Sequence, residues 1–332
     1  MAALRIEELE ELRIPLRAYC YRMLGSAADT EDAVQDAVVR AYRHRERFDP
    51  ARGALRPWVF RIATTVCLDL LRGARRRALC VDLGPGAVPG GELGSPLPAE
   101  RFVEPMPDAG LVVAGDPGEV AAQRESVRLA FVAALQHLPP RQRATLLLRD
   151  VLCFSAAETA GMLGTTPAAA NSALQRARET LERHRPAPTE TLDLAGPEQR
   201  DLLERYVAAF EAHDVARLAD LLCEDARASM PPFAWWLEGG GTIAALVGTG
   251  GCDGARLAPA AISGQPGFGQ YRPDDLGVLR PFALVLVETR RQRIAHLTTF
   301  LGTGDRFAEF GLPLVLHPES VPATDEYRAA RT

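Results

Sequence analysis

Polar side chains recur at helical spacing just past the middle of the chain, and they have the clearest chemical meaning in the sequence. They combine amide, hydroxyl, guanidinium and carboxylate groups, the types of donor and acceptor that read base edges in the major groove of DNA. The pattern therefore predicts contact with DNA. The residues are Asn171, Ser172, Gln175, Arg176 and Glu179.

Two short helices are predicted to position these side chains. Ser155-Ala-Ala-Glu158 reads as a capping box that opens the first helix, which ends at Gly164. Thr165 or Thr166 then caps the second helix, with Pro167 at its first position. Two helices joined by so short a turn form a helix-turn-helix. The alternative is an ordinary helical hairpin with a solvated face.

A second cationic face precedes this motif. A helix predicted to begin at Pro57 has an apolar inner stripe, and its opposite face runs into the cluster Arg72-Gly-Ala-Arg75-Arg76-Arg77. The alternative is a solvated helix end whose cations favour the dipole. The inner stripe is Val59, Ile62, Ala63, Val66 and Leu70, and the outer face is Arg61, Thr65, Asp69, Arg72 and Arg76.

Two further helices are predicted upstream. The first has one apolar stripe and ends at Gly25, and the second begins with the acids Asp29 to Asp32. The two stripes are Leu9, Leu12, Leu16, Tyr19 and Met23, and then Val34, Ala37, Val38, Ala41 and Tyr42.

Length and composition predict a soluble protein of two or three domains. The chain has 332 residues, of which 47% are hydrophobic and 24% are charged. No apolar run reaches the roughly 18 residues of a membrane span, and the charged N-terminus does not resemble a secretory signal, so we expect a cytoplasmic protein. The six cysteines fit neither a zinc site nor a disulfide framework, so no metal or cofactor is expected.

Charge and composition divide the chain. Residues 1–81 have a net charge of +4, residues 82–118 of −5, residues 119–185 of +3 and residues 186–332 of −7. Residues 82–118 contain eight Gly and seven Pro, so we predict a flexible acidic linker that buries no core. A shorter linker is predicted over 186–197. Three folded pieces remain, over 1–81, 119–185 and 198–318, with a tail over 319–332.

The third piece is predicted to be α+β. Helical spacing over Leu202–Leu222 gives way to strands over Arg256–Ser263, Gly267–Arg272, Phe282–Glu288 and Arg293–Leu301. The apolar run Phe282–Val287 suits a strand that is buried on both faces.

The first two pieces resemble bacterial extracytoplasmic-function sigma factors of the sigma-70 superfamily. Region 2 is matched by Tyr19-Cys-Tyr-Arg-Met-Leu-Gly25 and Arg56-Pro-Trp-Val-Phe-Arg-Ile-Ala-Thr64, and region 4 by Leu138-Pro-Pro-Arg-Gln-Arg143 and Asn171-Ser-Ala-Leu-Gln-Arg-Ala-Arg178. Residues 198–316 resemble a SnoaL-like domain, a cone-shaped α+β fold. The resemblance implies two all-α sigma modules followed by a SnoaL-like cone.

The resemblance implies a role for named residues. It implies that Asp32, Gln35 and Asp36 dock on the polymerase clamp, and that the loop from Phe48 to Arg56 captures a base flipped from the −10 element. The side chain of Trp58 either stacks on that base or packs. Residues implied to hold the −10 strand are Arg56, Arg61, Thr65, Arg72, Arg75 and Arg76, and those implied at −35 are Thr165, Thr166, Asn171, Ser172, Gln175, Arg176 and Arg178.

The sequence thus predicts a sigma factor that directs core RNA polymerase to promoter DNA, with the C-terminal domain modulating it. Some SnoaL-like relatives are cyclases, but no carboxylate pair or His–Asp spacing stands out, so no catalytic residue is expected. Two alternatives stay open: a polymerase-independent helix-turn-helix regulator, and a cyclase or isomerase fused to a DNA-binding arm. An unknown small-molecule ligand is expected in a cone pocket of Trp235, Trp236, Phe268, Tyr271 and His296.

Overall fold

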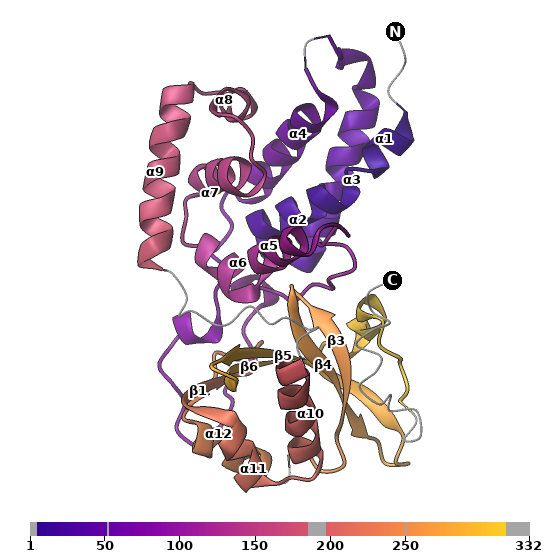
Figure 1. The fold of residues 1–332 in the computed structure, drawn as a ribbon, viewed down its shortest axis with the longest axis vertical. Coiled ribbons are helices and arrows are strands. Elements are labelled where there is room, and N and C mark those ends of the chain that lie inside the picture. Colours follow the sequence, from indigo (N-terminus) through magenta and orange to yellow (C-terminus); the bar gives the residue numbers. More distant parts are fainter. Residues whose placement is uncertain (1–4, 52, 185–196, 250, 317–332) are drawn as a thin grey trace. The chain divides into compact units, whose positions relative to one another are not determined.

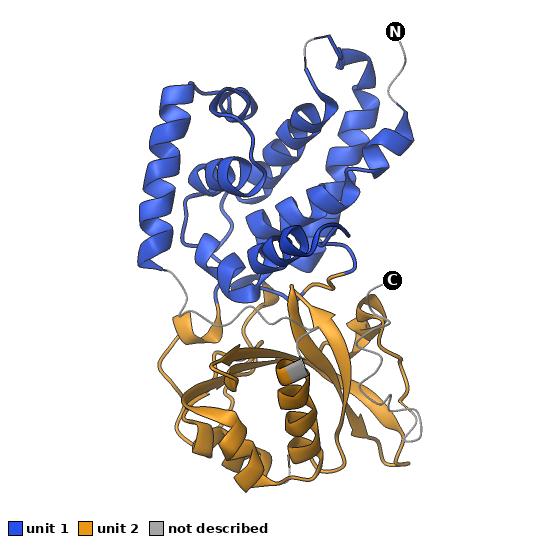
Figure 2. Cartoon of the chain, viewed as in Figure 1, with its two compact units in different colours: residues 1–78, 100–105, 109–186 blue, residues 79–99, 106–108, 187–332 orange. Residues whose placement is uncertain are grey.

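The chain forms two compact units in the computed structural model, which describes residues 5–51, 53–184, 197–249 and 251–316. The first unit takes in residues 1–78, 100–105 and 109–186, and the second takes in residues 79–99, 106–108 and 187–332 (Figure 2). Most of the predicted 186–197 linker and all of the predicted 319–332 tail lie outside the described residues.

The first unit begins with the predicted N-terminal helices (Figure 1). They are α1 (Ile6–Glu10), α2 (Arg13–Leu24), α3 (Ala27–Arg43) and α4 (Leu55–Leu70), with a 3-10 turn η1 (Arg45–Arg47) after α3. Gly25 ends α2 in the left-handed conformation, with φ of 67°, as the sequence predicts. The predicted first helix is divided in two between Glu10 and Arg13.

The inner stripes are confirmed with two exceptions. Val34, Ala37, Val38 and Ala41 are buried, but Tyr42 is 42% exposed, and the guanidinium of Arg45 lies 4.5 Å from its ring centre. Leu70 is 45% exposed at the end of α4. Both residues occupy the last turn of their helix, where no neighbouring helix covers the stripe.

The second half of the first unit contains the predicted helix-turn-helix. Its helices are α5 (Pro117–Val127), α6 (Leu129–Leu135), α7 (Pro140–Leu146), α8 (Ala156–Leu163) and α9 (Pro167–Arg183), with a π-helical turn η4 (Leu147–Val151) after α7. The capping box forms: the Glu158 amide donates to Ser155 Oγ at 3.2 Å, and the Ser155 amide donates to Glu158 Oε2 at 2.8 Å. Thr166 is the cap of α9, since its Oγ1 accepts from the Ala169 amide at 3.2 Å.

The two helical pieces that the sequence separates share one hydrophobic core. Tyr19, Phe60 and Cys67 from the first piece belong to the same cluster as Leu148 and Met162 from the second. The two helical pieces are therefore packed together in one unit in this arrangement of the chain.

A buried guanidinium joins the two pieces. Arg143 on α7 donates to the Met23 carbonyl at the end of α2, to Gln136 Oε1 at 2.6 Å and to the Leu138 carbonyl at 3.2 Å. Burial lowers the pKa of Arg143 to about 10. Since carbonyl and amide oxygens from both pieces surround this cation, separating the pieces breaks hydrogen bonds as well as apolar contacts.

The second unit is the α+β domain that the sequence predicts. Its sheet has the strand order β2-β1-β6-β5-β4-β3. The β1–β6 pair is parallel and the other pairs are antiparallel. The strands are β1 (Leu222–Ser229), β2 (Trp236–Glu238), β3 (Arg256–Ile262), β4 (Gln265–Pro273), β5 (Leu279–Arg290) and β6 (Arg293–Leu301).

Three helices cover one face of this sheet (Figure 1). They are α10 (Pro197–Glu211), α11 (Val215–Leu221) and α12 (Gly240–Val247), and their apolar residues join those of the strands in a second core cluster. A 3-10 segment η5 (Gly304–Phe310) packs against the other face, where a side chain at Gly269 would meet Phe307. The four predicted strands are confirmed as β3 to β6, whereas β1 and β2 were not predicted.

The segment predicted as a linker is packed. It contains two 3-10 turns, η2 (Cys80–Asp82) and η3 (Ala99–Arg101), and it ends where α5 begins at Pro117. The expectation that it buries no core is wrong, because Phe102, Val103, Met106 and Leu111 are buried. These residues lack a repeating period because each fills a separate site on a folded unit.

Candidate nucleic-acid interface

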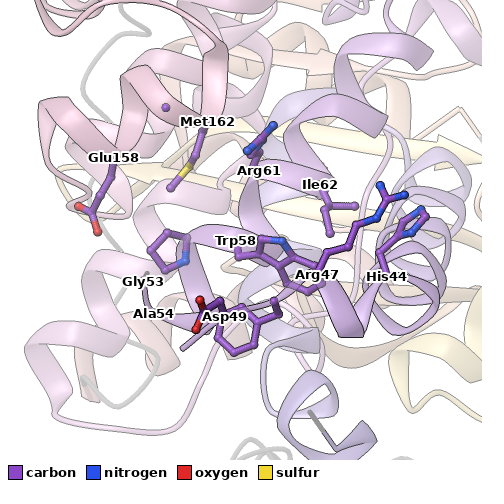
Figure 3. A pocket seen from close by; sticks show the side chains of 13 residues that line it. His44, Arg47, Asp49, Gly53, Ala54, Trp58, Arg61, Ile62, Glu158 and Met162 are labelled. Carbon is purple, nitrogen blue, oxygen red and sulfur yellow. The ribbon is translucent and has the colours of Figure 1, made fainter. Parts of the chain in front are cut away.

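A pocket of about 690 Å³ opens in the first unit beside the start of α4 (Figure 3). Three segments line it: the loop that follows α3, the first turns of α4, and α8 of the helix-turn-helix. The loop after α3 contributes the polar side chains of His44, Arg47 and Asp49. The lining residues are His44, Arg47, Phe48, Asp49, Gly53, Ala54, Pro57, Trp58, Arg61, Ile62, Glu158, Gly161 and Met162.

The pocket combines an aromatic surface with cations. The half-buried Trp58 packs on the hydrophobic core and also lines the pocket, and its ring lies 5.4 Å from that of Phe48. Figure 3 shows Trp58 in the middle of the lining residues, with Arg61 above it and Arg47 to its right. An aromatic ring stacks on a nucleobase and guanidinium groups attract phosphate, so this chemistry suits a single nucleotide and its backbone. The indole of Trp58 packs on the core and also faces the pocket, so packing and stacking on a base are compatible roles for it.

The outer face of α4 continues from the pocket toward the end of the helix. Arg61, Thr65, Arg72 and Arg75 are exposed, as the sequence predicts. The Thr65 hydroxyl donates to the Arg61 carbonyl at 3.0 Å, which leaves its lone pairs free to accept a hydrogen bond. Arg72 is paired with Asp69 at 3.2 Å.

Arg76 has a partner that the sequence does not predict. Its Nη1 lies 2.7 Å from the ring nitrogens of His137, which follows α6, and the ring of His137 stacks on that of His184 at 4.0 Å. In this arrangement the Arg76 guanidinium faces the second helical piece.

Arg56 is likewise turned toward the second helical piece. Its guanidinium lies 4.6 Å from the ring centre of Phe154 and 5.4 Å from that of Phe60. Its Nη1 donates to the Leu152 carbonyl at 3.4 Å, and burial lowers the pKa of Arg56. Arg56 therefore connects α4 to the segment that leads into α8, which the sequence does not predict.

The outer face of α9 presents the polar set as predicted. Thr165, Thr166, Asn171, Ser172, Gln175 and Arg176 are all exposed. Arg178 is exposed too, but its guanidinium makes a two-point ion pair with Asp150 at 2.8 and 2.7 Å. The hydrogen bonds that Arg178 donates to the Asp150 carboxylate raise the pKa of Arg178. In this arrangement Arg178 is therefore ion-paired with a carboxylate of its own unit.

The acidic residues predicted to dock on polymerase lie on one face of α3. Asp32 and Gln35 are exposed, and Asp36 is half-buried. Arg40, one turn further along, donates to Asp36 at 2.8 Å. This pair partly neutralises the Asp36 carboxylate, so Asp32 is the less screened of the two acids.

Comparison with known proteins shows which family has this pair of helical modules. The family model for sigma-70 region 2 matches residues 9–77, and that for sigma-70 region 4 matches residues 128–181. A curated relative, the ECF RNA polymerase sigma factor SigG of Mycobacterium tuberculosis, is 45% identical over 316 residues, which cover 92% of this chain and 82% of the relative. The chain belongs to the extracytoplasmic-function sigma factors.

The likeness to a second sigma factor extends to the C-terminal unit. SigJ of the same organism is 29% identical over 222 residues, which cover 67% of this chain and 63% of SigJ. The crystal structure of M. tuberculosis SigJ matches with a TM-score of 0.60 at 24% identity, over 93% of this chain and 100% of that one. The fold of the second unit is therefore shared with another sigma factor.

Membership in the sigma-factor family decides between the functions that the sequence left open. A sigma factor binds core RNA polymerase and promoter DNA, so the interpretation as a polymerase-independent regulator is set aside. Sigma factors regulate transcription and are not enzymes as a family. Among the described residues, no helix is long and apolar enough to cross a membrane.

The five residues predicted to line a cone pocket of this sigma factor do not come together. Trp235 and Phe268 are buried in the core between sheet and helices. Tyr271 packs on the opposite face, 5.1 Å from the ring centre of Phe307, and donates to the Pro313 carbonyl. Trp236 lies at the sheet edge, where its Nε1 donates to the Gly84 carbonyl. Alternation along β4 puts Phe268 and Tyr271, which are three positions apart, on opposite faces of the sheet.

His296, the fifth residue, lies among polar groups on the same face as Tyr271. Its Nε2 is 3.3 Å from Ser229 Oγ, and it stands opposite Glu288 in the β5–β6 pair. Burial lowers the pKa of His296 below its ordinary value. The pairing of His296 with Glu288 was not predicted, because a hairpin with seven intervening residues brings the two positions together. Within the described residues no group of three His, Cys, Asp or Glu could hold a metal ion.

Proposed function

We propose that this sigma factor captures a −10 base in the pocket beside Trp58 and holds the adjoining strand on the outer face of α4. The observation that carries the proposal is the continuity of the two features: the pocket leads onto the α4 face with exposed Arg61 and Thr65, and exposed Arg72 and Arg75 follow the end of that helix. A flipped base needs a stacking partner, and its backbone needs cations, and both are present without any covalent chemistry.

Trp58 is the residue that tests the pocket. We expect Trp58→Ala to weaken binding of a single-stranded −10 oligonucleotide to the holoenzyme about 5- to 150-fold, which corresponds to about 1–3 kcal/mol for one stacked base. Trp58→Phe is the control, because it keeps an aromatic ring on the core and in the pocket. If Trp58→Ala retains full oligonucleotide affinity with an unchanged melting temperature, the pocket does not hold the base.

We propose that α9 reads the −35 element through Asn171, Ser172, Gln175 and Arg176, with Thr165 and Thr166 at phosphate. Their exposure on one helix face supports this assignment, and the helix N-terminus favours a phosphate. We assign Asp32, Gln35 and Asp36 to docking on the polymerase clamp, where carboxylates pair with arginines. Because these partners are core polymerase and promoter DNA, we assign the protein to the cytoplasm.

Promoter binding requires the first unit to open. The −10 and −35 elements lie about 25 base pairs apart, or about 85 Å along B-DNA. The helices proposed to bind them share one hydrophobic core, and Glu158, Gly161 and Met162 of α8 form a wall of the −10 pocket. A negative carboxylate beside the pocket also opposes an incoming phosphate. We therefore propose that the described arrangement is a closed form, in which region 4 covers the −10 pocket.

The C-terminal unit is proposed to modulate transcription and to have no catalytic role. Ser229 and Glu288 are almost fully buried and His296 is half-buried, so little of this polar group is exposed to a substrate. Deleting residues 198–332 tests the assignment: we expect altered transcription from the cognate promoter with polymerase binding retained. Equal transcription from the full and the truncated chain, at several salt concentrations, would contradict it.

A further inference from the structure

One hydrogen bond on the outer face of α9 has no role in the assignments above. It joins Gln175 and Glu179, which lie one helical turn apart and are both exposed. The amide nitrogen of Gln175, Nε2, donates to Glu179 Oε1 at 3.2 Å. Asn171 lies one turn before Gln175, so the three side chains form a single row along the helix. A row that begins with two amides thus ends in a carboxylate.

The Glu179 carboxylate opposes DNA binding as a whole. The phosphates of DNA are negative, so an exposed acid beside them lowers the affinity for every sequence alike. The preceding cation, Arg178, does not offset this charge, because its guanidinium makes a two-point ion pair with Asp150. A favourable contribution of Glu179 to promoter recognition therefore has to be selectivity among sequences.

The hydrogen bond fixes which end of the Gln175 amide turns toward Glu179. An ionised carboxylate only accepts hydrogen bonds, so the amide NH2 group of Gln175 faces it and the amide carbonyl does not. One N–H and the carbonyl oxygen of Gln175 are left for the major groove. Adenine presents the complementary pair there, an N7 acceptor and an N6 donor, whereas guanine presents two acceptors and thymine an acceptor and a methyl group.

We propose that Gln175 reads an adenine of the −35 element and that Glu179 is the positioning residue that orients its amide. The proposal rests on the assignment of α9 to the −35 element made above, and it adds the base and the residue that fixes the choice. Without Glu179 the amide can adopt two orientations that differ by a half-turn, and only one of them pairs with adenine. Two equally populated orientations lower the apparent affinity for adenine about twofold.

The probe is a library of random-sequence duplex DNA, selected with holoenzyme that contains the full-length sigma factor and then sequenced. We expect the wild type to select adenine at one −35 position about 5- to 150-fold over other bases, the discrimination of one bidentate contact. Gln175→Ala should abolish the preference at that position. Glu179→Ala should lower the preference there by at least about twofold. It should also bind mismatched duplexes more tightly, because a negative charge is removed.

Two further variants separate orientation from charge. Glu182→Ala is the matched control, because it removes a carboxylate from the exposed last turn of the same helix, so it should raise affinity for all duplexes without altering the preference. Gln175→Glu combined with Glu179→Gln exchanges the two side chains and keeps the net charge. A carboxylate at the reading position accepts from cytosine N4, so we expect the preference to move from adenine to cytosine.

The selected base distinguishes this role from a structural one, since a pair that only stabilises the helix changes the melting temperature and not the preference. The proposal is overturned if Glu179→Ala keeps the full adenine preference, if the exchange variant still selects adenine, or if no selected adenine depends on Gln175. If Gln175→Ala and Arg176→Ala both leave the selected motif intact, the assignment of α9 to the −35 element fails as well. A motif that Arg176→Ala alone alters overturns the role of Gln175 and leaves that assignment standing.

Discussion

Arg56 offers the sharpest test of the closed form, because the sequence and the structure assign it opposite roles. The resemblance to sigma factors places it among residues that hold the −10 strand, so Arg56→Ala should weaken DNA binding. In the structure its guanidinium stacks on Phe154 and donates to the Leu152 carbonyl, so it holds region 4 against α4. On that basis Arg56→Ala loosens the cover over the pocket and should strengthen DNA binding by free sigma factor.

The magnitude follows from the contacts that are lost. A partly exposed cation–π contact contributes about 0.5–1 kcal/mol, and Arg56 makes one with Phe154 and a longer one with Phe60 on its own helix. The hydrogen bond to Leu152 is long and adds about 0.5 kcal/mol at most. Only the contacts to region 4 favour the closed form, so their loss shifts the equilibrium by about 0.5–1.5 kcal/mol. While the closed form dominates, apparent affinity then rises about 2- to 12-fold.

The assay is fluorescence anisotropy of a labelled single-stranded −10 oligonucleotide titrated with isolated full-length protein. Arg61→Ala is the control, because Arg61 lines the pocket and is exposed, so its loss should weaken binding and reduce the salt dependence by about one unit of slope. A fall in affinity for Arg56→Ala similar to that of Arg61→Ala would refute the argument and return Arg56 to the strand-holding set.

Three further predictions concern the other surfaces. Arg176→Ala should cost about 1–3 kcal/mol of promoter affinity while core-polymerase binding stays intact; unchanged promoter affinity in a gel shift would remove it from the reading set. Asp32→Arg combined with Asp36→Arg should abolish holoenzyme formation, and a normal holoenzyme band on a native gel would contradict the docking assignment. Asp150→Ala should release Arg178 from its ion pair, raise promoter affinity and steepen its salt dependence; if the slope stays the same, Arg178 does not reach DNA.

The sequence predicts well those features whose partners lie within one helical turn. The capping box of Ser155 and Glu158, the Gly164 end of α8 and the Thr166 cap of α9 are all contacts between residues three or four apart. The exposed sets on α4 and α9 follow from the same periodicity, because the inner stripe fixes which face remains outside. Family resemblance then supplied the chemistry of those faces.

The predictions that failed share a physical cause. They concern contacts between residues that are far apart in the sequence. Cys80 donates to the Phe233 carbonyl across 153 positions, and Met106 pairs with Ser263 across 157. Each such contact uses a single side chain with one backbone group, so it leaves no period in the sequence. Strand β1 was missed for a different reason: its pairing shifts register between Leu222 and Arg227, which interrupts the alternation that identifies a strand.

The distribution of covered and uncovered surfaces suggests an order of events. Asp32 and Gln35 on α3 are exposed in the closed form, whereas the −10 pocket is walled by α8. A partner can shift this equilibrium only through its greater affinity for the open form. Core polymerase can begin to bind through the face that is already exposed, whereas the −10 pocket is walled by α8 and the −10 and −35 surfaces are held in one unit. We therefore expect polymerase to bind first and to supply the free energy of opening, so that free sigma factor leaves promoters unoccupied.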